Sequence, residues 1–147
     1  METSADPERD KIRYKALGWV FKNIGPRIIS KKIIKILFGK TCVNDPAKQE
    51  MLNYWKSQIE SYPPSITRAL DGVIYRKDIY EEIANIKVPT LVMAGEEDVA
   101  TRPEKAVRIH GQIKNSRMIL IPGAGHSSCL EQPEKVNELI ENFIQKI

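Results

Sequence analysis

Two ionisable side chains, Asp98 and His126, follow short apolar runs that each end at a glycine. Asp98 lies in "AGEEDVATRP", just beyond Gly95, and His126 lies in "PGAGHSS", between a glycine and a serine. An aspartate that accepts a hydrogen bond from one imidazole nitrogen fixes the tautomer of the ring and stabilises its protonated form. The other ring nitrogen can then take a proton from a nucleophile. Asp98 and His126 are therefore the candidate acid and base of a site.

Each of these residues also has an ordinary structural interpretation. An aspartate after a strand commonly forms a turn or caps a helix, and a histidine in a glycine-rich turn commonly packs or donates a hydrogen bond. We expect the neighbouring Glu96 and Glu97 to form a solvated acidic edge. His110 lies inside a helical run, where we expect it at the surface.

The segments around Asp98 and His126 alternate between predicted strands and predicted helices. The runs "VPTLVMAG" and "RMILIPGAG" predict two buried strands, and "TRPEKAVRIHGQI" between them predicts a helix. In that helix Thr101 and Glu104 have the spacing of a capping box, with Pro103 in the first turn. The final segment predicts a helix with one apolar face: Val136, Leu139, Ile140 and Phe143. Strand, helix, strand, helix indicates a parallel sheet, and its carboxyl-end loops should bring Asp98 and His126 together.

The first half of the chain has a different pattern. Residues 10–76 show helical periodicity interrupted by Gly and Pro, with no strand pattern. Two short amphipathic helices are expected on either side of "GP", with apolar positions Leu17, Val20, Phe21 and Ile24, and then Ile29, Ile33, Ile36 and Leu37. Asp45 followed by Pro46 predicts the start of a third helix, and "YPPSITRALDGVIYR" starts a fourth.

Two segments together resemble the C-terminal half of an α/β-hydrolase, in the esterase, lactonase and cofactor-free haloperoxidase-like branch. "VPTLVMAGEEDVATRPEKA" matches the family's strand, Gly-x-x-Asp turn and helix, and "MILIPGAGHSSCLEQPEKVNELIENFI" contains its Gly-His-x4-Glu-x-Pro segment. The resemblance implies an α/β fold, with Asp98 as the acid and His126 as the base of a Ser-His-Asp triad. It implies an ester, lactone or similar acyl substrate, and neither a metal nor an organic cofactor.

The same resemblance divides the chain and exposes a gap. Residues 1–77 resemble the helical lid (cap) segment, and residues 78–147 resemble the C-terminal β-α-β-α part of the core. The Gly-x-Ser-x-Gly nucleophile elbow of the family has no counterpart in the sequence. "METSADPE" resembles the stretch that follows the family's sixth strand, where the lid begins. We therefore expect a partial hydrolase fold without the N-terminal half, inactive on its own.

Replacement nucleophiles within the chain are poor candidates. Ser127 and Ser128 follow His126 directly, and adjacent residues rarely face each other within the hydrogen-bond reach of about 2.6–3.2 Å that a base and nucleophile need. We expect these serines to bond the turn or line a pocket. Nothing marks Cys129 as having a lowered pKa, and a buried, inert thiol is expected.

A sheet of only two strands would leave apolar surface exposed, which suggests functions in assembly or binding instead of catalysis. One strand edge and much apolar helix surface would lack partners, so we expect a homo-oligomer, a complex with a separately encoded N-terminal hydrolase half, or poor solubility. A non-catalytic binding or assembly module derived from a hydrolase is the alternative function. The segment "RIISKKIIKILFGK" would suit a membrane-surface helix, but we favour a lid helix with lysines in water and isoleucines over the pocket or core. No nucleic-acid-binding motif is present.

Composition sets the remaining bounds. With 147 residues, 41% hydrophobic and 29% charged, the chain fits one soluble domain with a core. Its net charge of +4 comes from the N-terminal segment, since residues 1–40 carry ten Lys/Arg against four Asp/Glu. Cys42 and Cys129 have neither disulfide-framework nor zinc-ligand spacing. Without a signal-peptide or membrane-span pattern, a cytoplasmic protein is expected.

Overall fold

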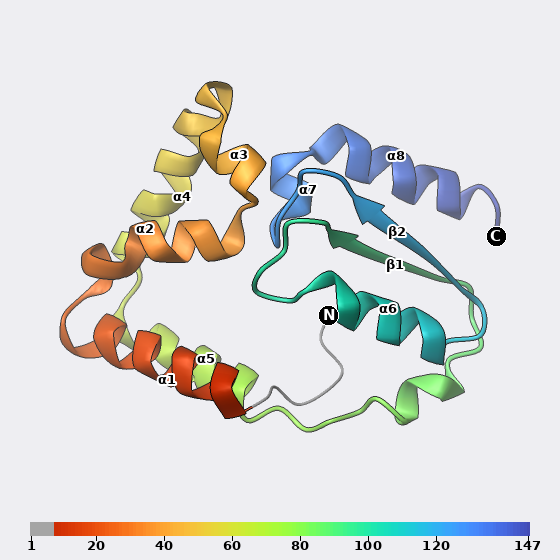
Figure 1. The fold of residues 1–147 in the computed structure, drawn as a ribbon, viewed down its shortest axis with the longest axis horizontal. Coiled ribbons are helices and arrows are strands. Elements are labelled where there is room, and N and C mark those ends of the chain that lie inside the picture. Colours follow the sequence, from red (N-terminus) through yellow and green to blue (C-terminus); the bar gives the residue numbers. More distant parts are fainter. Residues whose placement is uncertain (1–7) are drawn as a thin grey trace.

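The computed structural model describes residues 8–147, with side chains from residue 10 onward; the "METSADPE" prediction falls mainly outside this range. Figure 1 shows two parts that lie side by side, which we call the helical layer and the sheet layer. The helical layer, residues 8–74, contains α1 (Glu8–Asn23), α2 (Pro26–Leu37), α3 (Lys40–Asn44), α4 (Gln49–Ser61), α5 (Thr67–Ile74) and the 3-10 helices η1 (Pro46–Lys48) and η2 (Pro64–Ile66). The sheet layer, residues 90–144, contains β1 (Thr90–Gly95), α6 (Pro103–Gln112), β2 (Ser116–Ile121), α7 (Ser128–Glu131) and α8 (Pro133–Ile144). In the sequence, η3 (Glu82–Asn85) comes between the two layers, and in the structure it contacts α6.

The helical layer has its own apolar core, which explains why these short helices hold together. Its buried members come from α1, α2, α3, α4 and the α2–α3 turn: Phe21, Ile29, Ile34, Phe38, Cys42, Leu52 and Ile59. Helices of this length gain most of their stability from packing an amphipathic face rather than from propensity. The expected helices are confirmed, with α3 as a short addition that the sequence pattern does not predict.

Glycine, proline and aspartate set the helix boundaries as the sequence indicates. Gly25 separates α1 from α2 at a φ of 116°, a backbone conformation that favours glycine, and Pro26 occupies the first position of α2. Asp45 caps the next start, because its Oδ1 accepts a hydrogen bond from the Ala47 N–H at 2.8 Å. That start is a 3-10 turn, η1, which leads directly into α4. Ile24 follows α1 and is 56% exposed, so it does not join the expected apolar face.

The sheet is a parallel pair, as the strand–helix alternation predicts. β1 and β2 run in register from Thr90 opposite Ser116 to Gly95 opposite Ile121. α6 and α8 lie on opposite sides of the pair (Figure 1). α8 contributes Val136 to a small buried cluster with Ile121 and Ala124, and Met93 and Leu139 pack against it. The expected architecture, a helical segment followed by two parallel strand–helix units, is confirmed.

Three local predictions are wrong in detail. β1 begins at Thr90, and Val88 before it is mostly exposed. α6 has no capping box: its N-cap position is Arg102, without a side-chain cap, because the Thr101 N–H is already bound to the Asp98 carboxylate. Ile140 lies at the margin of the apolar face of α8 and is 37% exposed, since two strands are too few to cover that face fully.

Among the described residues, no helix combines the length and apolar character needed to cross a membrane.

Candidate active site

Asp98 is held rigidly in the loop after β1. Its side chain is almost completely buried, and Oδ1 accepts hydrogen bonds from the N–H groups of Ala100 and Thr101, both at 2.8 Å. This leaves Oδ2 for a different partner. Gly95 at the end of β1 has no room for a side chain, because a Cβ there would collide with the carbonyls of Ala124 and Gly125. The glycine therefore allows the loop that carries His126 to cross close to the Asp98 loop.

The structure brings His126 and Asp98 into direct contact. His126 Nδ1 lies 2.9 Å from Asp98 Oδ2, although the two residues are 28 positions apart. An ionised carboxylate only accepts, so Nδ1 carries the proton and donates it. Nε2 is then left as the basic nitrogen of the neutral ring. The His126 side chain is 42% exposed, which leaves this nitrogen accessible.

The electrostatics of the pair favour a protonated imidazole. The hydrogen bond to Asp98 raises the pKa of His126 above its ordinary value of 6.5, and burial of the ring opposes this by lowering the pKa. The charges of Asp98 and Glu131 add to the increase. A histidine held in this way can accept a proton during a reaction and keep the resulting positive charge stabilised.

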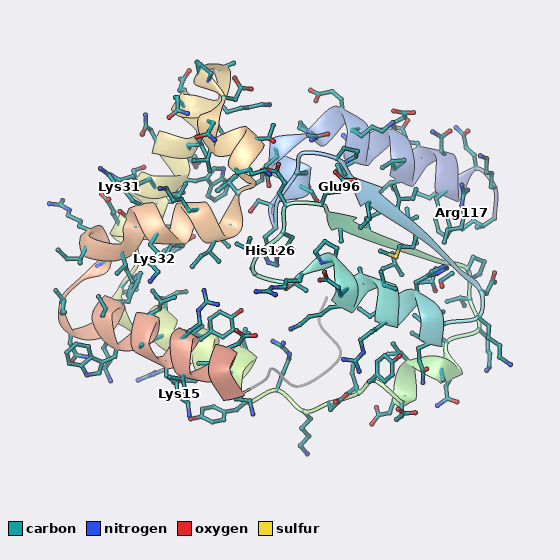
Figure 2. All side chains as sticks on the ribbon, in the orientation of Figure 1. Lys15, Lys31, Lys32, Glu96, Arg117 and His126 are labelled. Atoms are coloured by element: carbon teal, nitrogen blue, oxygen red, sulfur yellow. The ribbon has the colours of Figure 1, made fainter. Side chains whose placement is uncertain are left out.

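His126 lies where an apolar cavity of about 410 Å³ meets the sheet layer. The cavity is lined mainly by aliphatic side chains of α1, α2 and α5: Leu17, Ile29, Ile33, Ile36, Leu70 and Val73. Ile29, Ile33 and Ile36 of α2 thus face the cavity. Lys31 and Lys32 are exposed, and Figure 2 shows them on α2 with His126 between the layers.

A second hollow, about 460 Å³, runs along the length of β1. Its floor comes from all residues of β1, and its sides come from α6 and from Ile83 and Ile86 near η3. Asp98, His126 and Ser128 line its end. His126 therefore lines both hollows, one enclosed by α1, α2 and α5 and the other along β1.

The remaining sequence candidates have mixed outcomes. Ser128 lines the second hollow, as expected for a serine of this turn. Cys129 is exposed, so the expectation of a buried thiol is wrong there; it is the second residue of the one-turn helix α7, whose outer side faces solvent. The buried thiol is Cys42, and burial raises its pKa to about 11, which makes a thiolate nucleophile unfavourable. His110 is exposed, as predicted, with Nδ1 2.8 Å from Ser116 Oγ.

Two glutamates near the pair have roles that the sequence pattern did not reveal. Glu97 is not part of a solvated edge: its carboxylate accepts hydrogen bonds from the N–H and Oγ1 of Thr41, at 2.7 and 2.8 Å. Glu131 is 3% exposed and accepts from the N–H groups of Gly39 and Gly125. Glu131 belongs to the Gly-His-x4-Glu-x-Pro spacing, but no local signal connects either glutamate with residues 39–41.

The described residues contain no group of three or more His, Cys, Asp or Glu side chains placed to hold a metal ion.

A family model described as TAP-like protein matches residues 74–146 of the chain. This range contains the whole sheet layer, and with it both Asp98 and His126.

The chain is also similar to several known proteins. It is 29% identical to the proline iminopeptidase of Thermoplasma volcanium over 126 residues, which cover 69% of this chain and 42% of that protein. It is 36% identical to the AB hydrolase superfamily protein YisY of Bacillus subtilis over 73 residues, 49% of this chain and 27% of that protein. A solved thermophilic esterase from Thermogutta terrifontis matches with a TM-score of 0.84 and 26% identity, covering 98% of this chain and 53% of the esterase. The chain spans about half of the esterase and less than half of the two curated relatives.

Proposed function

The chain belongs to the α/β-hydrolase family, and we propose that it supplies the acid and base of an acyl-hydrolase site whose serine lies on a segment outside this chain. The substrate class is an ester, lactone or similar acyl compound. The observation that carries the proposal is the 2.9 Å contact of Asp98 Oδ2 with His126 Nδ1, beside an apolar cavity. The similarity to a solved esterase supports the choice of acyl chemistry.

In this mechanism the histidine moves one proton twice. Nε2 of His126 takes the proton of the serine hydroxyl as its oxygen attacks the acyl carbon, and Asp98 stabilises the imidazolium that forms. The imidazolium then gives the proton to the departing alcohol oxygen, leaving an acyl-enzyme. In the second half His126 activates a water that attacks the acyl carbon, and the serine recovers its proton when the ester bond to it breaks.

The serines next to the base do not replace the missing nucleophile. Ser127 and Ser128 directly follow His126, and the Ser127 N–H is used to donate to the carbonyl of Leu37 at 2.8 Å. No side-chain hydrogen bond joins either serine to the imidazole within the described part of the chain. The chain by itself should therefore show no turnover of a simple ester.

The free edge of β1 supports a docked segment as the source of the serine. The Thr90 N–H donates to Asn115 and the Glu96 N–H to Ile121, so the backbone groups of alternate residues face β2. Those of Leu91 and Met93 between them face the opposite edge, where the described sheet has no strand. An added strand there would fill the hollow along β1, which ends at His126. This position would place a nucleophile near the base.

The test is a fusion of this chain to the N-terminal part of the Thermogutta terrifontis esterase that the chain does not cover. We expect the fusion to hydrolyse a short-chain p-nitrophenyl ester, and the chain alone to give no rate above background. His126→Ala in the fusion should lower kcat by at least about 10³-fold, whereas His110→Ala should leave the rate unchanged.

Equal turnover by the His126→Ala and His110→Ala fusions would contradict the role of His126. A folded fusion that binds the ester without any turnover would instead favour the alternative, a binding module that kept the cavity without the chemistry. Circular dichroism of every variant separates these outcomes from a failure to fold.

A further inference from the structure

The turn between α2 and α3 contacts both loops that carry the Asp98–His126 pair. We call residues 37–41 the junction. They belong to the helical layer, and the chain separates them from Asp98 by more than fifty positions. Figure 1 shows this end of α2 and α3 beside the ends of β1 and β2. The junction donates hydrogen bonds to two carboxylates, and its Leu37 carbonyl accepts one from the loop of His126.

Glu131 joins the junction to the loop of His126. Its Oε2 accepts from the Gly39 N–H at 2.9 Å, and its Oε1 accepts from the Gly125 N–H at 2.9 Å. The carboxylate is buried, so both hydrogen bonds are shielded from water. Charge-assisted bonds to a buried carboxylate are among the stronger hydrogen bonds in proteins. One side chain thus fixes the residue before His126 to the helical layer.

The residue after His126 is fixed from the same side. The Ser127 N–H donates to the carbonyl of Leu37 at 2.8 Å. His126 is therefore flanked on both sides by backbone groups that are bound to the junction, one directly and one through Glu131. A shift of the junction relative to the sheet would move both flanks of the imidazole together.

Glu97 makes the equivalent connection for the other loop. It precedes Asp98, and its carboxylate accepts from the N–H and the hydroxyl of Thr41 at 2.7 and 2.8 Å. Lys40 lies 3.9 Å from the same carboxylate. Burial is the largest single effect and raises the pKa of Glu97, but the hydrogen bonds from Thr41 and the charge of Lys40 together outweigh it, so that the pKa lies below its ordinary value. Glu97 thus remains ionised and bound to the junction in the neutral pH range.

We infer that Glu97 and Glu131 are positioning residues. Their carboxylates bind the junction to the loops of Asp98 and His126. The position of the helical layer therefore sets the geometry between Asp98 and His126. Neither glutamate touches the hydrogen bond that joins the pair. The inference rests on the proposed function only for its consequence in catalysis. The coupling between the layers and the pair is a property of this chain alone and is tested without any turnover.

The steric fit at the junction shows how little movement it allows. A Cβ on Gly39 would come within 2.7 Å of Glu97 Oε2 and 2.8 Å of the Gly125 nitrogen, and one on Gly125 would collide with the Gly39 backbone. The two backbones therefore touch at paired glycines, between the two carboxylates. Helical layer and sheet layer are in contact here without an intervening side chain.

The experiment uses the intact chain and one variant for each of the two connections, Thr41→Val for the Asp98 loop and Glu131→Ala for the His126 loop. Thr41→Val removes the hydroxyl bond to Glu97 without changing any charge near His126. We expect the His126 titration midpoint, followed by NMR, to fall by a few tenths of a pH unit toward 6.5, because the Asp98–His126 bond loosens. Thr67→Val is the matched control, since the Thr67 hydroxyl bonds to Pro64 within the helical layer.

Glu131→Ala tests the other loop by amide hydrogen exchange. Exchange at Gly39 and Gly125 should accelerate about tenfold or more, since each loses a bond to a charged acceptor. Exchange at Ser127 should accelerate as well, although its acceptor on Leu37 is untouched by the substitution. Glu138→Ala is the control, because Glu138 is an exposed residue of α8 that forms its ion pair with Lys135 on the same helix, away from the junction.

Wild-type exchange at Ser127 in Glu131→Ala, together with an unchanged His126 midpoint in Thr41→Val, would overturn the inference. If Glu131→Ala does not fold, Thr41→Val decides alone, because Thr41 is an exposed residue whose substitution leaves the core intact. An inactive esterase fusion would count against the proposed function and would leave these two measurements unaffected.

Discussion

The two histidines of the chain show how strongly environment decides the chemistry of one residue type. Both lie within hydrogen-bond distance of a side-chain oxygen, Ser116 Oγ for His110 and Asp98 Oδ2 for His126. The Ser116 hydroxyl donates to the carbonyl of Ile113 at 2.6 Å, so it offers the His110 ring an uncharged acceptor. Asp98 is different, because its Oδ1 already accepts from two backbone N–H groups and its Oδ2 faces the ring. The negative charge of this carboxylate favours the protonated form of the His126 imidazole. The carboxylate therefore raises the affinity of His126 for a proton, as a general base requires.

The first prediction concerns the titration of His126. In the intact chain its NMR titration midpoint should lie above 6.5, and Asp98→Asn should move the midpoint downward because the main cause of the raised pKa is removed. His110 serves as the internal control in the same spectra. A midpoint of His126 that does not respond to Asp98→Asn would contradict the electrostatic role assigned to the pair.

The same shift links the pair to stability. Because the folded-state pKa of His126 is raised above its unfolded value, its contribution to stability is fully present below about pH 6.5 and is lost as pH rises through the folded-state pKa. The difference in urea midpoint between wild type and Asp98→Asn should therefore be larger at pH 5.5 than at pH 9. The partial exposure of His126 keeps the effect modest.

At the scale of elements, the decisive features are places where two backbones approach without side chains between them. Gly95 and Gly125 sit at the ends of the two strand-to-loop connections, and neither can accept a Cβ without displacing neighbouring backbone. Such contacts let the Asp98 loop, the His126 loop and the junction converge on one point. They also explain why glycine appears in both loops without a positive φ at these two positions.

The second prediction tests this close approach. Gly125→Ala should lower the free energy of unfolding by ~1–3 kcal/mol, because the added methyl group overlaps the backbone of Gly39. Gly72→Ala, inside α5 and with open space within 4 Å of where its methyl group would lie, should instead stabilise by about 0.5–1 kcal/mol through helix propensity. Urea denaturation of both variants measures the contrast, and a neutral Gly125→Ala would refute the packing argument.

Element types were predictable from the sequence, but their ends and contacts were less so. Apolar spacing identified four of the helices of the helical layer and both strands, since burial of one face leaves a periodic pattern. The capping box at Thr101 failed because the Asp98 carboxylate competes for the same N–H. The bonds of Glu97 to Thr41 bring together residues 56 positions apart, and no local pattern encodes such a partner.

At the scale of the whole molecule, the described residues form two well-defined layers, and the edge of β1 in their sheet has no neighbouring strand. β1 pairs with β2 on one side only, and the opposite edge borders the hollow along α6. Within β1 no residue is charged or proline, the devices that usually protect a strand edge. β2, by contrast, carries Arg117, which is exposed (Figure 2). This contrast is consistent with our proposal that a further strand docks on the edge of β1.

The third prediction follows from the direction of the backbone groups in β1. Leu91→Pro removes an N–H that faces the free edge, so the two-stranded sheet should persist, whereas Val92→Pro removes a bond to β2 and should unfold it. In the esterase fusion, Leu91→Pro should abolish turnover while the protein stays folded by circular dichroism. Full activity of the Leu91→Pro fusion would exclude this edge as the docking position.

The sequence by itself determined the class of the fold, the candidate acid and base, and the absence of a Gly-x-Ser-x-Gly elbow from this chain. Those features are carried by periodicity and by short motifs, which are local properties of the chain. Only the tertiary structure decided that Asp98 and His126 touch, that the isoleucines of α2 line a cavity beside them, and that Glu97 and Glu131 bind the junction. Each of these contacts joins residues that are far apart in the sequence. They form because the two layers pack together, and no local pattern predicts them.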